Sequence, residues 1–312
     1  MNDSNKTARA KPAQPLVYII VLTWNGKADT LACLSSLEKI EYSNWRICLV
    51  DNASTDGTVA AVRSSFRRVE IIENSENLRF ATGNNVGIEY ALKQGADYVL
   101  LLNNDTRVAE DFLTRLVEVA ESDGHIGMAG SKIYHFDRPD LIWSAGGTIS
   151  FWRGEIAHRG LRKHDAQKYN ETQDVAYLTG CTLLVKRGVI EQVGLLDPAY
   201  FIYTEDADWC ERTRRAGYRL VYVPESKVWH KVSATSGGGL SPFKVTHKLK
   251  SNFQFFKKYA RWYHWMSIPF FVYGSTFWFI TRQLTQGNFG IIASLFKGFK
   301  EILTNRSVSK TV

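Results

Sequence analysis

Apolar and polar positions alternate along the first 133 residues in a pattern that predicts strands separated by helices. Short, nearly continuous apolar runs predict buried strands at residues 16–22, 45–50, 69–72, 98–102 and 126–130. Segments of helical periodicity lie between them, at residues 27–38, 57–66, 83–94 and 109–122. Continuous apolar strands separated by helices are typical of a parallel sheet covered on both faces. We therefore expect an α/β fold with a Rossmann-like, mostly parallel sheet, whose ligands bind at the carboxyl ends of the strands.

Polar residues follow three of these expected strands, at the point where each strand ends. They are, in chain order, Thr23 and Asn25, then Asp51 and Asn52, then Asn103, Asn104 and Asp105. Each set taken alone is explained by a helix cap or an Asx turn. Because the carboxyl ends of parallel strands meet at one edge of a sheet, the three sets together predict a shared ligand site.

The second half of the chain is expected to add a strand at 176–185, a helix at 205–216 and a strand at 219–224. Acids open that helix and arginines close it, which is ordinary complementarity to the helix dipole. Capping does not explain why Glu205 and Asp206 follow an aromatic run, which should remove water from at least one of them. A glycine-rich stretch at 233–242 predicts a mobile loop, with the function of a lid over a bound ligand.

The residue types at the strand ends indicate chemistry with phosphates and a divalent ion. Asp105 is a hard oxygen ligand suited to Mg²⁺ or Mn²⁺, which bind through one or two carboxylates and substrate phosphates. The amides of Asn103 and Asn104 could orient ribose or phosphate, and Asp51 with Asn52 could read the imide edge of uracil or thymine. His230 could be a further metal or diphosphate contact, although a lone histidine in this context is more often structural.

Transfer of a group from a phosphate donor to a hydroxyl also needs a carboxylate that takes the acceptor proton. We expect Asp206 to be this base, with Glu205 binding the acceptor or positioning the loop. The alternative is a pair of acids at a helix start with no catalytic role.

An ordered set of six motifs resembles the inverting glycosyltransferases of family 2 with the GT-A fold, especially their bacterial rhamnosyltransferase-like branch. The motifs are TWNG (23–26), VDNASTDGT (50–58), NLRFATGNNVGI (77–88), LLNNDT (101–106), LTGCTLLVKR (178–187) and YTEDADWCERTRRAGY (203–218). The resemblance covers about residues 16–235. It implies that Asp105 binds the metal, that Asp206 is the base and that His230 lies near the diphosphate and the metal. The donor would contact Thr23, Asn25, Asp51, Asn52, Asn84, Asn103 and Asn104.

The same resemblance suggests a donor and an acceptor. The WSAGG segment (143–147) and the NND triplet favour dTDP-rhamnose, and other nucleotide sugars of the dTDP or UDP type, carrying galactofuranose or glucose, are the alternative. The acceptor would be a lipid-linked or polysaccharide glycan of the cell envelope. Two features depart from the family: Arg79 stands where a glycine is expected, and the QxxRW signature of processive members is missing, which argues against polymerisation. Amides in place of acids leave the metal with fewer charged ligands.

The C-terminal region is basic and aromatic. The chain carries a net charge of +8, and from Ser226 onward thirteen Lys and Arg stand against one acid, Glu301. Residues 247–263 predict a basic amphipathic helix. Its apolar face would be Leu249, Phe253, Phe256, Ala260 and Tyr263, flanked by Lys250, Lys257, Lys258 and Arg261.

Residues 265–281 form a seventeen-residue run without a formal charge. A membrane span needs about 20 apolar residues, with about 17 as the lower limit, and Pro269 and Gly274 weaken the run further. We expect this segment to lie in a membrane interface. A re-entrant or spanning helix, or packing on the catalytic domain or a partner subunit, are the alternatives.

Four regions are expected along the chain: a disordered tail (1–15), a catalytic domain (16–235), a mobile loop (236–246) and a membrane-associating helical region (247–312). The N-terminus lacks an apolar signal-peptide core, and the four scattered cysteines suggest reduced thiols. We therefore expect the enzyme at the cytoplasmic face of the cell membrane, peripheral or shallowly inserted, in contact with an anionic membrane surface. Nucleic acid is not an expected partner, and a homo-oligomer is left open.

Two other function classes fit parts of the pattern. A sugar-phosphate nucleotidyltransferase would also use an α/β sheet and a metal-bound carboxylate, but no glycine-rich signature follows the first strand and no lysine is placed for a triphosphate. A non-catalytic scaffold that binds nucleotide sugars or nucleic acid is permitted by the basic tail, although basic clusters alone are weak support for nucleic-acid binding.

Overall fold

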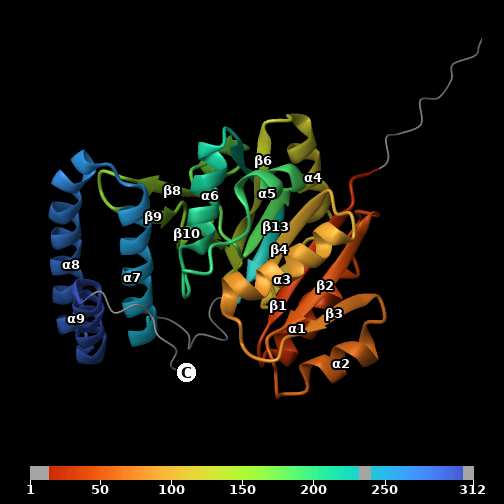
Figure 1. Cartoon of the computed structure of the whole chain (residues 1–312), viewed down its shortest axis with the longest axis horizontal. Helices are drawn as coiled ribbons and strands as arrows, with labels where there is room; N and C mark the ends of the chain where they lie inside the picture. The colour runs from red at the N-terminus through yellow and green to blue at the C-terminus, as the bar shows by residue number, and fades with distance from the viewer. Residues whose placement is uncertain (1–13, 232–239, 305–312) are drawn as a thin grey trace, which may run out of the picture.

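The computed structural model describes residues 14–231 and 240–304, which form a sheet flanked by helices and a separate layer of C-terminal helices (Figure 1). The strands are β1 (Val17–Thr23), β2 (Trp45–Asp51), β3 (Val69–Glu73), β4 (Tyr98–Asn103), β5 (Thr106–Val108), β6 (Ile126–His135), β7 (Leu141–Ser144), β8 (Gly147–Ser150), β9 (Glu155–His158), β10 (Lys163–His164), β11 (Gln173–Asp174), β12 (Thr182–Lys186) and β13 (Arg219–His230). The helices are α1 (Lys27–Leu37), α2 (Thr58–Ser65), α3 (Arg79–Lys93), α4 (Phe112–Ser122), α5 (Arg187–Val193), α6 (Glu205–Arg215), α7 (Pro242–Tyr259), α8 (Ile268–Thr285) and α9 (Phe289–Leu303), with the 3₁₀ turns η1 (Gln167–Tyr169) and η2 (Trp262–Met266).

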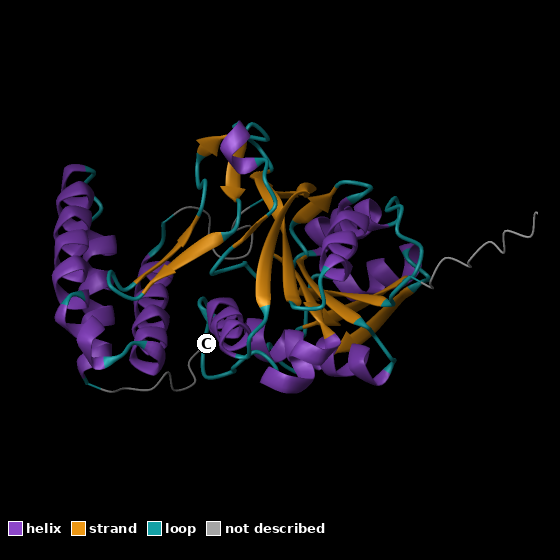
Figure 2. Ribbon diagram, turned by 90° about the horizontal axis from the view of Figure 1, so that it is seen from above, coloured by secondary structure: helices purple, strands orange, loops and turns teal. Residues whose placement is uncertain are grey.

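The expected parallel core is confirmed in the order β3, β2, β1, β4. Helices cover both faces, as Figure 2 shows from above. Successive residues of a strand point to opposite faces, so Ile19 packs into a core with α1, α2 and α4, whereas Ile20 packs into a second core with α3, α5 and α6. Both faces of β1 are therefore buried, which explains its continuous apolar run. Gly87 lets α3 approach closely, since a Cβ there would lie 2.5 Å from a methyl group of Ile20.

Beyond β4 the sheet is mixed, which the sequence pattern did not predict. Strand β12 lies between β4 and β6 and runs antiparallel to both, and β13 then pairs in parallel with β6. A buried apolar run has the same pattern in either direction, so periodicity could not reveal this reversal. The strand expected at 176–185 is also shorter than predicted, because only residues from Thr182 onward join the ladder.

Helix α7 connects the body of the molecule with α8 and α9. In Figures 1 and 2 it lies between the body on one side and these two helices on the other. Its predicted apolar face is wrong in part. Phe255, Phe256 and Tyr259 are buried against the core of the catalytic domain, whereas Phe253 is exposed. Two sides of α7 are covered, because Thr246 also donates a hydrogen bond to the carbonyl of Ser294 in α9. A helix buried on two sides does not show the single stripe that the helical wheel assumed.

The predicted basic flank of α7 is likewise partly used inside the protein. Lys258 lies 2.8 Å from Asp208 and 3.0 Å from Asp197, and Lys250 lies 2.6 Å from Glu301. Asp208 belongs to α6 and is fully buried. Its ion pair with Lys258 therefore links α6 to α7 inside the protein. Helix α7 therefore packs on the catalytic domain, whereas the alternative of such packing was raised only for residues 265–281.

One of the expected domain limits needs adjustment. Helix α7 begins at Pro242, with the Ser241 hydroxyl accepting a hydrogen bond from the Lys244 amide, so residues 242–246 are helical rather than part of a loop. Residues 1–13 and 232–239, which carry most of the expected tail and of the expected glycine-rich lid, lie outside the described residues. In the part of the chain that is described, no helix combines the length and the apolar character needed to cross a membrane.

Candidate active site

The polar strand ends lie side by side at one edge of the parallel sheet, as predicted. Thr23 at the end of β1 is in register with Asp51 at the end of β2, and Asn103 at the end of β4 pairs with Leu22. Three sets of polar residues that are up to 82 positions apart in sequence thus share one edge. We first consider what each side chain does there.

Asp51 presents an unsatisfied acceptor. Its side chain is buried, and Oδ2 accepts a hydrogen bond from the Ser54 amide at 2.9 Å. Oδ1 is also buried and has no hydrogen-bond partner among the described residues. Leaving a buried carboxylate oxygen unpaired costs free energy, so this atom is suited to accept a hydrogen bond from an N–H group of a ligand.

Asn52 has its amide fully engaged by the loop before α3. Its Nδ2 donates to the Asn77 side chain and to the Arg79 carbonyl, both at 3.2 Å, and its Oδ1 accepts from Asn74 at 2.9 Å. Asn52 therefore fixes this loop. Arg79 adopts a left-handed φ of 66°, which explains why glycine is expected at this position, and its guanidinium lies 3.6 Å from the ring centre of Phe201.

Thr23 and Asn104 form a buried hydrogen-bonded group with Thr30 of α1. The Asn104 amide donates to Thr23 at 3.2 Å and to Thr30 at 3.0 Å, and the two hydroxyls are 2.9 Å apart. Gly26 is in contact with this group, since a Cβ there would lie 2.5 Å from Nδ2 of Asn104. These side chains hold the loop after β1 against the NND turn.

The remaining predicted donor contacts differ in their surroundings. Asn25 is exposed and accepts a hydrogen bond from the Thr55 amide at 2.8 Å, which joins the loops after β1 and β2. Asn84 is buried in α3 and donates to the Phe80 carbonyl at 2.9 Å. Asn103 is half-buried, and its backbone amide donates to the Cys181 carbonyl at 3.0 Å.

Asp105 and His230, the two predicted metal contacts, lie together. Oδ1 of Asp105 is 3.1 Å from Nε2 of His230, and both side chains are buried. Strand β13 pairs with β5 in a register that sets His230 opposite Thr106, and this pairing brings the two residues together. Burial alone would lower the pKa of His230, but the neighbouring Cys181 and Asp105 raise it.

The pair fits a divalent ion that takes further ligands from a phosphate donor. It offers one carboxylate oxygen and one imidazole nitrogen, and Nδ1 of His230 is buried without a hydrogen-bond partner in the described residues. Within residues 14–231 and 240–304 no three His, Cys, Asp or Glu side chains gather into a complete ion site. Mg²⁺ and Mn²⁺ commonly complete their coordination with phosphate oxygens and water. His230 would lose a proton on binding such an ion.

Glu205 and Asp206 open α6 after two residues with left-handed backbone, Tyr203 (φ 66°) and Thr204 (φ 74°). Asp206 Oδ2 accepts hydrogen bonds from the Tyr177 hydroxyl at 2.8 Å and from the Gly180 amide at 3.0 Å. Such strained backbone is common where a functional side chain must be held in one place.

The two acids have different ionisation. Burial and the charge of Asp206 raise the pKa of Glu205 to about 8, and its Oε2 has no partner among the described residues. Burial also raises the pKa of Asp206, but the hydrogen bonds from Gly180 and Tyr177 favour its charged form. Two adjacent buried carboxyls do not both ionise readily, so the single negative charge of the pair resides on Asp206 at neutral pH.

Residues 177–181, which we call the bridging loop, connect the acid pair with the metal pair. Tyr177 and Gly180 bond Asp206, and Cys181 contacts His230. A Cβ on Gly180 would lie 3.0 Å from the Phe80 ring, so the loop packs tightly against α3 as well. Asp206 therefore contacts this five-residue loop directly, and Asp105 is linked to it through His230.

Sequence reasoning missed four residues near the acid pair. The ring of Tyr177 in the bridging loop lies 5.4 Å from that of His158 in a tilted arrangement. His158 lies 4.7 Å from Trp143, which in turn lies 4.7 Å from His230, measured between ring centres. The side chain of Lys248 in α7 is exposed. Its pKa is nevertheless lowered, because the loss of solvating water caused by the surrounding protein outweighs the charge of Asp206, which raises it. Trp143 opens the WSAGG segment, but the other three residues carry no local signal, since only tertiary packing brings them to the site.

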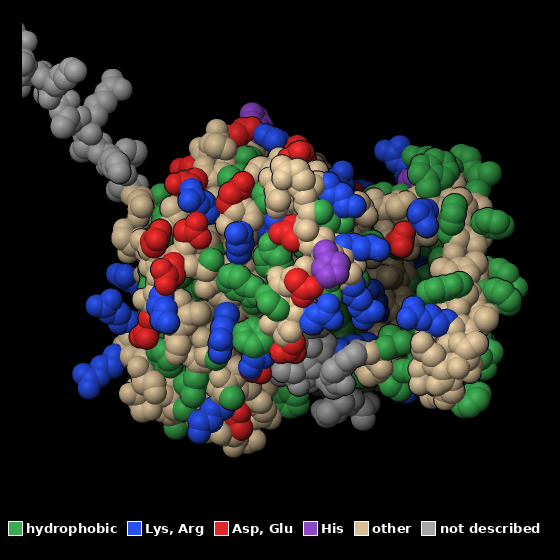
Figure 3. Space-filling model, turned by 180° about the vertical axis from the view of Figure 1, so that it is seen from behind, with side chains coloured by type: hydrophobic (Ala, Val, Ile, Leu, Met, Phe, Trp, Pro, Cys, Tyr) green, Lys and Arg blue, Asp and Glu red, His purple; other side chains and the backbone are tan. Residues whose placement is uncertain are grey.

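The molecule is hollowed between its body and the C-terminal helices, as Figure 3 shows.

Burial, Lys248 and His230 lower the pKa of His158 to about 4, so this histidine is neutral at physiological pH. His158 therefore adds no charge beside Lys248 and Asp206.

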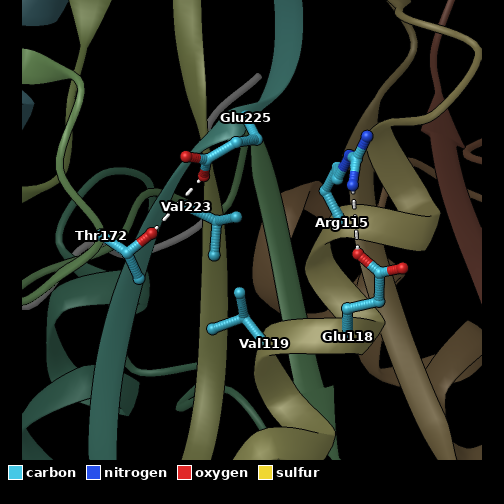
Figure 4. Close-up of a pocket in the computed structure, with 6 residues that line it drawn as sticks. All are labelled: Arg115, Glu118, Val119, Thr172, Val223 and Glu225. Carbon is cyan, nitrogen blue, oxygen red and sulfur yellow. Dashed lines mark hydrogen bonds and ion pairs between the residues drawn. The ribbon is translucent and has the colours of Figure 1, made fainter.

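A separate pocket of about 240 Å³ lies between α4 and β13 (Figure 4) and is lined by Arg115, Glu118, Val119, Thr172, Val223 and Glu225. None of these is a predicted site residue. Its polar groups are already paired, Arg115 with Glu118 and Thr172 with Glu225, each at 3.4 Å. We therefore place the candidate site at the strand edge.

Comparison with known proteins gives three findings. A model of the family described as glycosyl transferase family 2 matches residues 18–194. An uncharacterized protein of Sinorhizobium fredii is 27% identical over 241 residues, which are 74% of this chain but only 26% of that relative's length. The N-acetylglucosaminyl-diphospho-decaprenol L-rhamnosyltransferase of Mycobacterium tuberculosis is 28% identical over 253 residues, which are 74% of this chain and 81% of the relative.

Among solved structures, a mannosyltransferase from Pyrobaculum calidifontis in complex with GDP-Man and Mn²⁺ superposes with a TM-score of 0.58 at 16% identity. The superposition covers 96% of this chain and 77% of that chain. At this level of identity the likeness shows the fold, which is GT-A-like.

Proposed function

Because the chain belongs to glycosyltransferase family 2, whose members transfer sugars with inversion, we propose that it moves L-rhamnose from dTDP-rhamnose to a lipid-linked or polysaccharide acceptor. The observation that carries the proposal is that the bridging loop bonds Asp206 through Gly180 and contacts His230 of the Asp105–His230 pair through Cys181. The rhamnose and the lipid-linked acceptor are suggested by the similar enzyme of Mycobacterium tuberculosis.

The nucleotide would bind at the carboxyl edge of β1 and β2. The unpaired Oδ1 of Asp51 can accept a hydrogen bond from the imide N–H that thymine and uracil share. Asn52, which fixes the neighbouring loop, would shape this pocket rather than contact the base, because its own amide groups are occupied. A base without an imide N–H, such as cytosine, would leave Oδ1 unpaired and bind more weakly.

The diphosphate would lie at the end of β4. Asp105 and His230 would hold a Mg²⁺ or Mn²⁺ ion, which when bound supplies positive charge to the departing diphosphate. Asn103, with its half-buried side chain at the same strand end, is placed to contact the donor beside them. The buried setting strengthens each of these electrostatic interactions relative to water.

Asp206 would take the proton from the acceptor hydroxyl as that oxygen attacks the anomeric carbon. The hydrogen bonds from Tyr177 and Gly180 orient its Oδ2, and Oδ1 lies near the Ala207 amide at 2.8 Å. Burial raises the pKa of Asp206, which makes the carboxylate a better proton acceptor near neutral pH. Glu205, protonated, adds no charge that would repel an anionic donor.

The acceptor would approach from the side of the C-terminal helices. Lys248 is the cation near Asp206 there, and a lipid-diphosphate acceptor carries the complementary charge. Helix α7 would thus contribute to acceptor binding as well as to the attachment of the C-terminal layer.

A donor screen tests the proposal. The full-length protein with Mn²⁺ is incubated with dTDP-rhamnose, a UDP-hexose or GDP-mannose and a polyprenyl-diphosphate-linked acceptor, and release of nucleoside diphosphate is measured with and without acceptor. We expect acceptor-dependent turnover with dTDP-rhamnose. Turnover with a UDP-hexose alone would reject rhamnose but keep the pyrimidine site, and turnover with GDP-mannose alone would reject both.

A further inference from the structure

The outer surface of α8 and η2 exposes a row of large apolar side chains, which we call the aromatic face. Its members are 62–78% exposed. They are Trp262, Met266, Phe270, Tyr273, Phe277 and Trp278. Their spacing of three to four residues along the helix places most of them on one side. We propose that this face docks the protein on an anionic lipid bilayer.

The aromatic face is the outermost layer of the molecule. Helix α8 lies beyond α7 on the side away from the sheet in Figures 1 and 2, and Figure 3 shows apolar side chains gathered on these helices. Only Ile268 and Gln283 of α8 are buried. An exposed apolar surface of this extent on a folded domain indicates a partner that is missing from the structure.

The charge around the face matches an anionic surface. Residues 240–304 carry nine Lys and Arg but a single acid, Glu301, and Lys250 neutralises that acid at 2.6 Å. The Arg282 guanidinium lies 5.5 Å from the Trp278 ring, and that of Arg153 lies 5.6 Å from the Phe271 ring. Aromatic rings with adjacent cations are typical of side chains that occupy the headgroup region of a bilayer.

Two other occupants are less suitable. The residues of this chain that lie outside the description, 1–13, 232–239 and 305–312, contain no aromatic, leucine or isoleucine side chain that could cover the face. In a two-fold dimer of this chain, the cations beside the face, Arg153 and Arg282, would approach the same cations of the second copy. Like charges repel across such an interface.

The docking would be peripheral. The aromatic face occupies one side of α8, and the described helices lack the length and apolar character of a span. A helix that lies in the interface buries its apolar face only about 5–10 Å deep. The inference narrows the sequence-based expectation that residues 265–281 lie in a membrane interface and that residues 247–312 associate with membranes, because it places the contact on η2 and α8 while α7 packs on the catalytic domain.

This inference deepens the proposed function, because docking would hold the site near an acceptor carried by a lipid, and it rests on that function only for the acceptor. Helix α7 links the docking layer to the site through the Thr204 hydroxyl, which donates to Asn252 at 3.0 Å, and through Ser251, which donates to the Ile202 carbonyl at 2.8 Å. The docking layer and the acid pair thus form a continuous structure.

Flotation with vesicles tests the docking face. Full-length protein is mixed with vesicles of phosphatidylcholine alone or of phosphatidylcholine with phosphatidylglycerol. We expect binding to the second kind, and we expect the triple variant Phe270→Ser, Tyr273→Ser, Phe277→Ser to reduce the bound fraction about tenfold or more. The control Leu161→Ser removes an exposed apolar side chain elsewhere on the surface and should bind like the wild type.

Three results separate the outcomes. Replacing the same three residues by leucine keeps an apolar face and should retain most of the binding. Unchanged vesicle binding of the serine variant would overturn the inference. So would a wild-type protein that does not bind vesicles but forms a dimer, if the serine variant is a monomer. Thermal stabilisation by dTDP, measured without lipid, should be equal in all variants, and its absence in the wild type would count against the proposed donor instead.

Discussion

The candidate site buries charged side chains, whereas the C-terminal helices expose aromatic ones. Glu205, Asp206, Asp105 and His230 are all at most 9% exposed, while Phe270 is 77% exposed. Each region reverses the usual distribution of polar and apolar groups and so costs stability relative to an ordinary core or surface. Such local exceptions are expected at functional sites, and here they indicate two different ligands, a charged donor and a lipid surface.

The largest expected effect separates the chemistry of the first region from the docking of the second. In Asp206→Asn the amide cannot accept the acceptor proton, so kcat should fall by about 10²–10⁴-fold. Binding of dTDP and of vesicles should not change. The control Glu191→Gln alters an acid that pairs with Arg187 at the surface and should keep full activity. Turnover of the Asn variant at the wild-type rate would show that Asp206 is not the base.

The next effect concerns the ion. Asp105→Asn removes the charged oxygen of the metal pair, so the Mn²⁺ concentration needed for half-maximal activity should rise by about 10–100-fold. Isothermal titration with Mn²⁺ in the presence of dTDP measures the same loss without turnover. An Asn variant with wild-type affinity for the ion would remove Asp105 from the site, and Asp111→Asn at an exposed surface pair is the matched control.

Stability against pH tests the burial of the acid pair. The folded pKa of Glu205 is raised from 4.5 to about 8, so between these values the native state holds a proton that the unfolded chain has lost. The free energy of unfolding therefore falls as pH rises through this window. Glu205→Gln cannot ionise and should be more stable at neutral pH by on the order of 2 kcal/mol, with a smaller gain near pH 5. Urea unfolding at both pH values would measure this, and a gain that shrinks as pH rises would contradict it.

The smallest expected effect lies where the two regions meet. Lys248→Gln should raise KM for a diphosphate-linked acceptor by about threefold to tenfold, because an exposed cation contributes a modest attraction. KM for the donor and vesicle binding should not change. Lys257→Gln, which removes another exposed cation of the same helix, is the control. Equal KM values for both variants would exclude Lys248 from the acceptor site.

The sequence predicted the strand edge well because its signals are local. Each of Asp51, Asp105 and Asp206 follows a recognisable strand or opens a recognisable helix, and the parallel order of β1, β2 and β4 then brings the strand ends together. The resemblance implied that Asp105 and His230 both lie near the metal, and the antiparallel register of β13 and β5 brings the two together.

The remaining features depend on contacts between distant segments. The reversal of β12 positions the bridging loop, and apolar periodicity carries no information on strand direction. The face of α7 was predicted incorrectly because the helix is covered by both the catalytic domain and α9. The exposure of Phe270 and Tyr273 is also a tertiary property, since the same residues in a packed helix would give the same sequence pattern.

A structure of the protein with dTDP and Mn²⁺ tests the central claim most directly. We predict an imide N–H within hydrogen-bonding distance of Asp51 Oδ1, an ion between the diphosphate and the Asp105–His230 pair, and Asp206 facing the space where the sugar would lie. A nucleotide bound away from Asp51, or a diphosphate away from the Asp105–His230 pair, would contradict the account.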